Sequence, residues 1–216
     1  MIMSNFSSMV AMIDAYLLSY GIEQNIKSSL HETSKNKCDN CTDVVYAYNG
    51  MELEVIDMDS IAKNGYKKIK KPSYPLEKPI NTVDAFLINS QNQWFFVEFK
   101  DAPINDTKNK ITIFKKAYAN WYMLMEILYK MKNTENEYAG FDFSNPIEFA
   151  QNNVYYIAVF TTAKNPQLYM QIKNQDLVKS TYTPPFMERL KAYVFKDAFV
   201  FTESFFERKF VRNFSY

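Results

Sequence analysis

The sequence predicts a mixed α/β fold in which a central β-sheet is flanked by helices, and three observations predict it. Runs with apolar residues three and four positions apart cover 5–20, about 108–132 and 186–194, which is helical spacing. Apolar runs at 82–88 and 94–100 are separated by five polar residues, as in a β-hairpin. The run 154–160 is apolar at every position, as in a strand buried on both faces. This order of elements favours one mixed sheet covered by helices.

The chain has 216 residues, enough for one domain with a substantial core. Its 18 Phe and 16 Tyr, with only 4 Gly, exclude a disordered chain. The formal net charge of +1 excludes a general attraction to nucleic acid, so any such binding has to come from local patches. We expect a single domain over 1–216, with a core at about 43–160, an N-terminal helix at 5–20 and a C-terminal α/β extension at 180–216.

The first helix is expected over 5–20, with Ser4 as its N-cap and Gly21 as its stop. A shorter helical segment is expected at 23–30. No cationic region precedes the apolar start and Asp14 interrupts it, so no signal peptide is expected. No uncharged apolar run approaches the length of a membrane span. These features predict a cytoplasmic protein that does not bind membranes.

The two cysteines, Cys38 and Cys41, have C-x-x-C spacing, and His31 is the only histidine. A zinc site would need two further ligands, and the polar flanking residues are typical of a loop rather than of a redox motif. We interpret the pair as ordinary thiols, with metal or redox use as the alternative.

A hairpin is predicted at 44–56, because Asn49-Gly50 between two alternating runs is typical of a type I′ turn. Glu52 and Glu54 would lie on the solvent face of its second strand. Glu54 is a weak candidate for a carboxylate that joins a functional site.

Residues 61–80 form a basic segment that is expected to be irregular, because Gly65 and three prolines interrupt it. Tyr66 and Tyr74 lie between the lysines. Such a loop suits phosphate contacts and base stacking, and a solvated loop without a partner is the alternative. The candidates for nucleic-acid binding here are Lys67, Lys68, Lys70 and Lys71.

The hairpin at 82–100 carries charge where buried strands should have none. A three-residue loop, 90–92, would place Asp84 directly opposite Glu98, because it pairs position 86 with position 96. A four-residue loop would turn Asp84 to the opposite face. We favour the three-residue loop, because Asn92 tolerates the left-handed conformation that its last position needs.

In this register the carboxylates of Asp84 and Glu98 lie on neighbouring strands, roughly 5 Å apart at Cβ. Like charges at that distance repel, so the pair needs a cation between them. Lys100 supplies one positive charge. A divalent metal would supply more, and hard oxygen ligands suit Mg²⁺ or Mn²⁺.

Asp84, followed fourteen residues later by Glu98-Phe99-Lys100 on a strand-turn-strand unit, resembles the PD-(D/E)xK nuclease superfamily. The resemblance covers the hairpin and the helix after it, within about 43–160. It implies a restriction-endonuclease-like αβββαβ core. It also implies that Asp84, Glu98 and the backbone carbonyl of Phe99 bind the metal, and that Lys100 positions or activates the attacking water. A structural cross-strand salt bridge is the alternative.

The long helix is expected at about 108–132, capped by Asp106 or Thr107. The resemblance implies that basic residues of this helix face the site, and Lys115 and Lys116 are the candidates for nucleic-acid contact. A solvated helix face is the alternative. An acidic residue on the first helix could add to the site, with Glu23 as a weak candidate. The buried stripe of the long helix is predicted to be Ile111, Phe114, Tyr118, Trp121, Met125 and Leu128.

The remaining chain is expected to contain an acidic linker at 134–150, the buried strand at 154–160 and a helix around 186–194. A last strand is predicted at 198–201. For 204–214 the pattern leaves strand and short helix open.

Together these features predict a Mg²⁺- or Mn²⁺-dependent nuclease that hydrolyses phosphodiester bonds of nucleic acid, with DNA the favoured substrate. Asp84, Glu98 and Lys100 are its catalytic candidates. The first alternative is a catalytically inactive member of the same fold that binds nucleic acid or protein. The second is a structural protein whose hairpin carries a salt bridge. A homodimer is left open.

Overall fold

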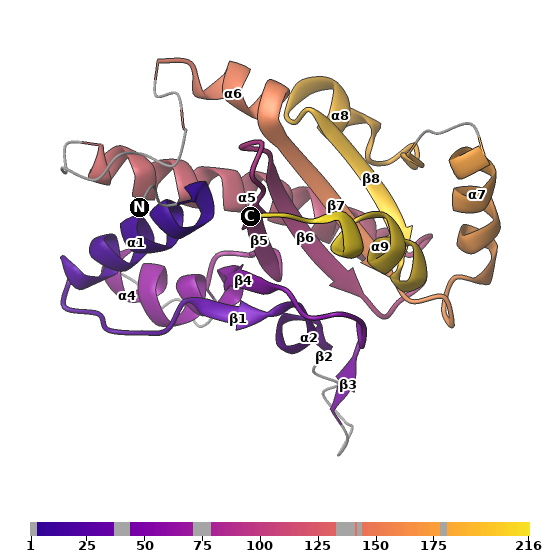
Figure 1. Ribbon diagram of the computed structural model, residues 1–216, viewed down its shortest axis with the longest axis horizontal. Coiled ribbons are helices and arrows are strands. Elements are labelled where there is room, and N and C mark those ends of the chain that lie inside the picture. Colours follow the sequence, from indigo (N-terminus) through magenta and orange to yellow (C-terminus); the bar gives the residue numbers. More distant parts are fainter. Residues whose placement is uncertain (1–3, 37–43, 71–78, 133–140, 142–143, 178–180) are drawn as a thin grey trace.

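The computed structural model describes residues 4–36, 44–70, 79–132, 141, 144–177 and 181–216. Six strands form one mixed sheet with helices on both faces, which confirms the predicted fold class (Figure 1). In spatial order the strands are β1 (Lys27–Ser29), β4 (Glu54–Asp57), β5 (Ala85–Ile88), β6 (Trp94–Lys100), β7 (Val154–Phe160) and β8 (Asp197–Thr202). β1, β4, β5 and β6 pair antiparallel, whereas β6, β7 and β8 pair parallel.

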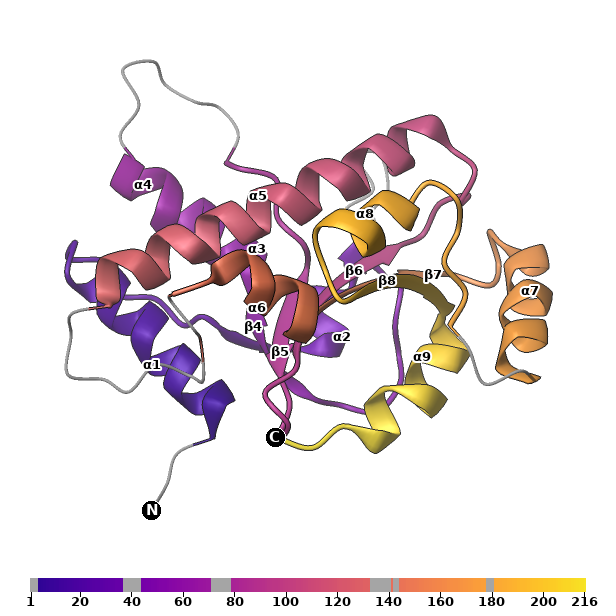
Figure 2. The same ribbon diagram turned by 90° about the horizontal axis from the view of Figure 1, so that it is seen from above.

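The helices cover the two faces of this sheet unequally. The longest, α5 (Thr107–Met131), and the short α8 (Glu188–Tyr193) lie over one face of β6, β7 and β8, and α9 (Glu203–Lys209) lies over the other (Figure 2). α1 (Asn5–Leu18) packs beside α5. The other helical segments are α2 (Leu30–Thr33), α3 (Met58–Ser60), a π-helix (Ile61–Tyr66), α4 (Lys67–Lys70), α6 (Pro146–Asn153), α7 (Pro166–Leu177) and a 3₁₀ turn (Val211–Asn213).

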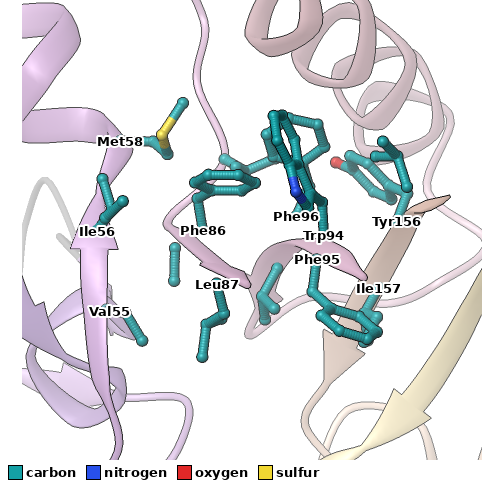
Figure 3. Close-up of a cluster of buried hydrophobic side chains, with 14 of the residues drawn as sticks. Val55, Ile56, Met58, Phe86, Leu87, Trp94, Phe95, Phe96, Tyr156 and Ile157 are labelled. Carbon is teal, nitrogen blue, oxygen red and sulfur yellow. The ribbon is translucent and has the colours of Figure 1, made fainter. Parts of the chain in front are cut away.

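The two faces of β6 follow from the alternation of its side chains. Trp94 and Phe96 lie on the α5 face with Phe86 and Tyr156, whereas Phe95 lies on the opposite face (Figure 3). Every residue of β6 except Lys100 is buried, so this strand lies at the centre of the core. Glu98 is on the α5 face because it is two residues from Phe96.

The hairpin between β5 and β6 has the predicted register. Phe86 pairs with Phe96 and Ile88 pairs with Trp94, so the loop is Ser90–Asn92. Asn92 has φ of 57°, the left-handed conformation on which the three-residue loop depends. Local turn chemistry therefore predicted the pairing of two buried strands correctly.

The hairpin predicted at 44–56 is wrong. β4 pairs with β1 and β5 rather than with residues 44–48, and among the described residues only Asn92 and Gly21 have positive φ, so Asn49-Gly50 is not a type I′ turn. β3 (Val45–Tyr46) pairs instead with β2 (Lys35–Asn36). The helix predicted at 23–30 is also wrong, because β1 occupies 27–29 as the edge partner of β4. Tertiary strand pairing outweighs the local signal in both segments.

The described part of the basic segment is helical rather than irregular. Residues 58–70 run through α3, the π-helix and α4 without interruption. A Cβ atom at Gly65 would lie 2.5 Å from Leu17 Cδ2, so the glycine permits close packing of α1 rather than breaking the helix. Lys71, Tyr74 and the prolines of 72–75 lie outside the described residues, as do Cys38 and Cys41.

The buried stripe of α5 differs from the predicted one. Ile111 and Tyr118 are 50% and 51% exposed, whereas Ile113, Ala117, Asn120 and Leu124 are fully buried. The helix is thus rotated so that smaller side chains face the sheet and Lys116 lies at the edge of the buried face. The helix bounds and the Asp106 cap agree with the prediction.

The C-terminal part contains more helix than expected. α6 begins at Pro146 inside the predicted linker, with Asn145 as its N-cap, and α7 was not predicted. The segment left open becomes α9 and a 3₁₀ turn. Within the residues that the structure describes, each helix is too short or too polar to cross a bilayer.

Candidate functional site

Four charged side chains converge where β6 ends beneath α5. Glu98 and Lys100 lie on the α5 face of β6, Asp84 directly precedes β5, and Lys116 reaches them from α5. The Glu98 side chain is 0% exposed, and those of Asp84, Lys100 and Lys116 are 18%, 16% and 15% exposed. The structure therefore brings together the three residues predicted as catalytic and one of the two predicted helix lysines.

Asp84 is held against β6 by both its backbone and its side chain. Pairing of β5 with β6 ends at Ala85 and Val97, and the Asp84 backbone N–H donates to the Val97 carbonyl at 3.1 Å. Asp84 Oδ2 accepts a hydrogen bond from the backbone N–H of Phe99 at 2.6 Å. The carboxylate thus sits against the Glu98–Lys100 segment, as the register argument required, although Asp84 itself lies outside the paired strand.

Glu98 is the centre of the cluster. Its Oε2 accepts a hydrogen bond from Lys116 Nζ at 2.6 Å. Its Oε1 lies 2.6 Å from Nζ of both Lys116 and Lys100, in ion-pair contacts that are not aligned as hydrogen bonds. Lys116 Nζ is also 3.6 Å from Asp84 Oδ1. The cation that the two carboxylates need is therefore Lys116, assisted by Lys100.

Burial and like charge shift the titration of the site. Desolvation, followed by the charge of Glu98, raises the pKa of Asp84 to about 7, although Lys116 and the Phe99 N–H act in the opposite direction. Desolvation acts to lower the pKa of Lys116, but the charges of Glu98 and Asp84 outweigh it and the pKa is raised. Lys116 thus remains an ammonium ion, and Asp84 changes charge near neutral pH.

Three residues that sequence reasoning missed contribute to the site. Asp59 in α3 accepts a hydrogen bond from Thr82 Oγ1 at 2.6 Å, and its charge further raises the pKa of Asp84. Tyr156 and Asn120 are 0% exposed, and within the described residues the Tyr156 hydroxyl and Asn120 Oδ1 have no hydrogen-bond partner. Burial, with the charges of Glu98 and Asp84, raises the pKa of Tyr156. None of them belongs to a recognisable motif; the two tyrosines in an otherwise apolar buried strand, Val154–Phe160, were the one signal.

The other predicted basic candidates lie away from the cluster. Lys115 is exposed on the outer face of α5. Lys67, Lys68 and Lys70 belong to α4, and Lys70 pairs with Glu126, ten residues or about 15 Å along α5 from Lys116. The structure does not place these lysines beside the carboxylates, and it does not describe Lys71.

The weak carboxylate candidates are also separate from the site. Glu54 pairs with Lys27 at 2.9 Å, at the end of β4 opposite to the one that approaches Asp84. Glu23 is exposed and precedes β1. His31 stacks on Tyr46, and its Nδ1 bonds the Tyr48 carbonyl oxygen at 3.0 Å. The only histidine is therefore a structural residue.

The donor atoms of the cluster fit a hard divalent cation. No group of three or more His, Cys, Asp or Glu suited to a metal gathers in the described ranges. Two carboxylates do meet here, and Glu98 Oε1 is buried without an aligned donor. The backbone of Phe99 is held against Asp84, so its carbonyl is a candidate third oxygen. Such a set suits Mg²⁺ or Mn²⁺, provided that Lys116 moves away from the carboxylates.

Asp84→Asn is expected to remove a pH dependence of stability. Because the folded pKa of about 7 lies above the ordinary 3.8, the stability contributed by this group is complete below about pH 4 and is lost as the pH rises to about 7. The free energy of unfolding of the variant minus that of the wild type should therefore increase by at least about 1 kcal/mol between about pH 4 and pH 8. Urea unfolding in EDTA measures it, and a difference that is constant or decreases would show that Asp84 titrates normally.

Comparisons of the chain with protein-family models, with curated proteins and with solved structures find no match, so the chemistry of this site has to be inferred from its own residues.

Proposed function

We propose that the protein is a metal-dependent nuclease whose active site consists of Asp84, Glu98, Lys100 and Lys116. The observation that carries the proposal is their convergence at the carboxyl end of β6, with the buried Glu98 within 2.6 Å of both ammonium groups. Two carboxylates and two lysines in one small, partly closed site suit hydrolysis of a phosphodiester. The carboxylates attract a metal, and the lysines neutralise an anionic substrate.

The order of the elements supports the same reading of the fold. When β1, the β2–β3 pair and the short helices are set aside, α1 precedes three antiparallel strands, β4, β5 and β6, and α5 precedes β7, which is parallel to β6. This is the αβββαβ order that the PD-(D/E)xK superfamily implies. The carboxylates stand at the second and third of these strands, where that superfamily carries its metal ligands.

The roles of the residues follow from their exposure and contacts. Asp84 and Glu98 would hold the metal, together with the Phe99 carbonyl. The chemistry that Mg²⁺ or Mn²⁺ would supply there is a lower pKa of a bound water molecule and neutralisation of charge on the phosphate. Lys100, in contact with Glu98, would orient the attacking water. Without a metal, Lys116 balances the charge of the two carboxylates. When a divalent cation neutralises the carboxylates instead, the Lys116 ammonium group would turn toward the phosphate.

Lys100→Met is expected to reduce metal-dependent cleavage of a labelled oligonucleotide by about 100-fold or more, because loss of one electrostatic donor typically costs that much. The variant should still bind Mn²⁺, since both carboxylates remain. Lys173→Met, an exposed lysine on α7, is the matched control and should retain wild-type activity. Undiminished cleavage by a folded Lys100→Met protein would remove Lys100 from the mechanism.

One observation favours a second function, that of a binding module without catalysis. Two carboxylates and two ammonium groups already balance, so the site needs no metal to be electrically neutral. In that case Lys116 fixes α5 to the sheet, and the surface of the protein binds the partner. The two functions differ in one measurable property, because only the nuclease has to bind a divalent cation.

A further inference from the structure

A groove lies at the same end of the sheet as the carboxylate cluster. It has a volume of about 590 Å³, within the usual range for small-ligand pockets. Its walls come from the loop after β6, the N-terminal part of α5, the start of α7 and the segment before α8. The side chains used in the argument are Asn105, Lys110, Lys164, Gln167, Tyr182 and Phe186.

The wall of this groove is positively charged. Lys110 and Lys164 line it, and no aspartate or glutamate does. Within the described part of the chain, neither lysine has a carboxylate at ion-pair distance, unlike Lys63, Lys70, Lys100 and Lys116. Two cations that share a concave surface without acidic partners favour an anionic ligand.

Aromatic and amide groups accompany the charge. Lys110 Nζ lies 5.7 Å from the centre of the Phe186 ring, so an ammonium group and an aromatic face adjoin inside the groove. Tyr182 provides a second ring, and Asn105 and Gln167 present exposed amides. In a nucleotide, ammonium groups bind the phosphate, aromatic rings stack on the base, and amides form hydrogen bonds with the edge of the base.

The groove is built on a fixed support rather than on loose loops. The buried Asn165 accepts a hydrogen bond from the Ile104 N–H at 2.7 Å. Its amide nitrogen donates to the carbonyl oxygens of Ala102 and Thr161, at 2.9 and 3.1 Å. These bonds tie the loop after β6 to the end of β7, so one wall of the groove is continuous with the strand that carries Glu98 and Lys100.

The distance to the cluster is short. Lys110 precedes Lys116 by six residues on α5, which is about 9 Å along the helix axis. The loop that lines the groove begins directly after Lys100. A strand of nucleic acid in the groove would thus lead to the carboxylates within a few nucleotides.

We infer that the groove binds one unpaired nucleotide of a single-stranded nucleic acid, with its phosphate between Lys110 and Lys164 and its base against Phe186 and Tyr182. The inference rests on the proposed function for the destination of the strand, and it names the substrate as single-stranded. A base can stack on a protein ring only when it has left its neighbours in the duplex, so a paired strand lacks half of these contacts.

The test measures binding in EDTA, where no cleavage occurs, by fluorescence anisotropy of labelled 12-nucleotide single strands of DNA and RNA and of the matching DNA duplex. We expect at least about tenfold tighter binding of one of the single strands than of the duplex. The double variant Lys110→Ala/Lys164→Ala should weaken single-strand binding about tenfold or more and reduce the salt slope by about 0.7, as expected for the loss of one phosphate contact. Phe186→Leu, which preserves apolar bulk, should weaken it about fivefold or more.

The matched control is the double variant Lys115→Ala/Lys173→Ala, which changes two exposed lysines outside the groove and should bind within about twofold of wild type. Equal binding of single strand and duplex, or wild-type binding by the folded groove variants, would overturn the inference. If the groove variants bind normally and wild type cleaves, the groove is wrong and the nuclease stands. If the groove variants lose binding and no metal supports cleavage, the nuclease is wrong and the groove stands.

Discussion

Replacing Lys116 with methionine is expected to lower the free energy of unfolding by about 3 kcal/mol or more. Glu98 is 0% exposed and receives its one aligned hydrogen bond from Lys116. Removing one partner of a buried ion pair leaves an uncompensated charge, which typically costs about 3–5 kcal/mol. Among the described residues, Lys100 then remains as the only lysine in contact with Glu98, and it contacts only the oxygen that lacks an aligned bond.

Urea unfolding at neutral pH in EDTA measures this loss. Lys115→Met is the matched control, because this neighbouring side chain is exposed to solvent, and it should change stability by less than about 0.5 kcal/mol. The double variant Glu98→Met/Lys116→Met should recover most of the loss, since an apolar pair can replace a buried ion pair. If Lys116→Met is as stable as Lys115→Met, Lys116 does not hold the cluster together.

Glu98→Gln is expected to reduce kcat/KM for metal-dependent cleavage by at least about 100-fold, which corresponds to about 2.7 kcal/mol. The substitution keeps the shape of the side chain and removes the negative charge that a divalent cation needs. Glu54→Gln, an exposed glutamate at the other end of the sheet, is the control and should cleave normally. Thermal melting is the control that checks that both variants are folded. Normal cleavage by folded Glu98→Gln would exclude Glu98 from the active site.

The sequence predicted the centre of this fold because its signals there are local. A five-residue polar segment and one residue able to adopt φ of 57° determine the β5–β6 loop, and the loop determines the register. That register brings Asp84 to the face of Glu98. The convergence of the two carboxylates thus followed from turn chemistry and side-chain alternation, without knowledge of the rest of the chain.

The sequence could not predict which helix lysine reaches the site. α5 carries apolar residues on several faces, and both Ile111 and Ile113 could belong to a buried stripe. Packing against the sheet buries Ile113, Ala117 and Leu124 and leaves Ile111 exposed. This choice of face brings Lys116 to Glu98 and turns Lys115 to solvent. The face that α5 buries depends on the shape of the sheet surface, which cannot be read from the local sequence of the helix.

The prediction of the strands before β5 was wrong for a related reason. Asn49-Gly50 is a strong hairpin signal, but residues 54–57 find better partners in β1 and β5, which are far apart in sequence. Asp59 and Tyr156 reach the site through the same long-range pairing and belong to no motif. The charged residues of the hairpin were therefore predictable, and their surroundings were not.

Calorimetric titration of the wild-type protein with Mn²⁺ near pH 8 tests the nuclease proposal most directly. This pH lies above the pKa of Asp84, which is about 7, so the Asp84 carboxylate is available to a cation. We predict binding of one ion per chain at millimolar concentrations or below, with binding lost in Asp84→Asn and Glu98→Gln and retained in Lys100→Met. The absence of binding by wild type, or unchanged binding by Glu98→Gln, would contradict the account and favour the binding module.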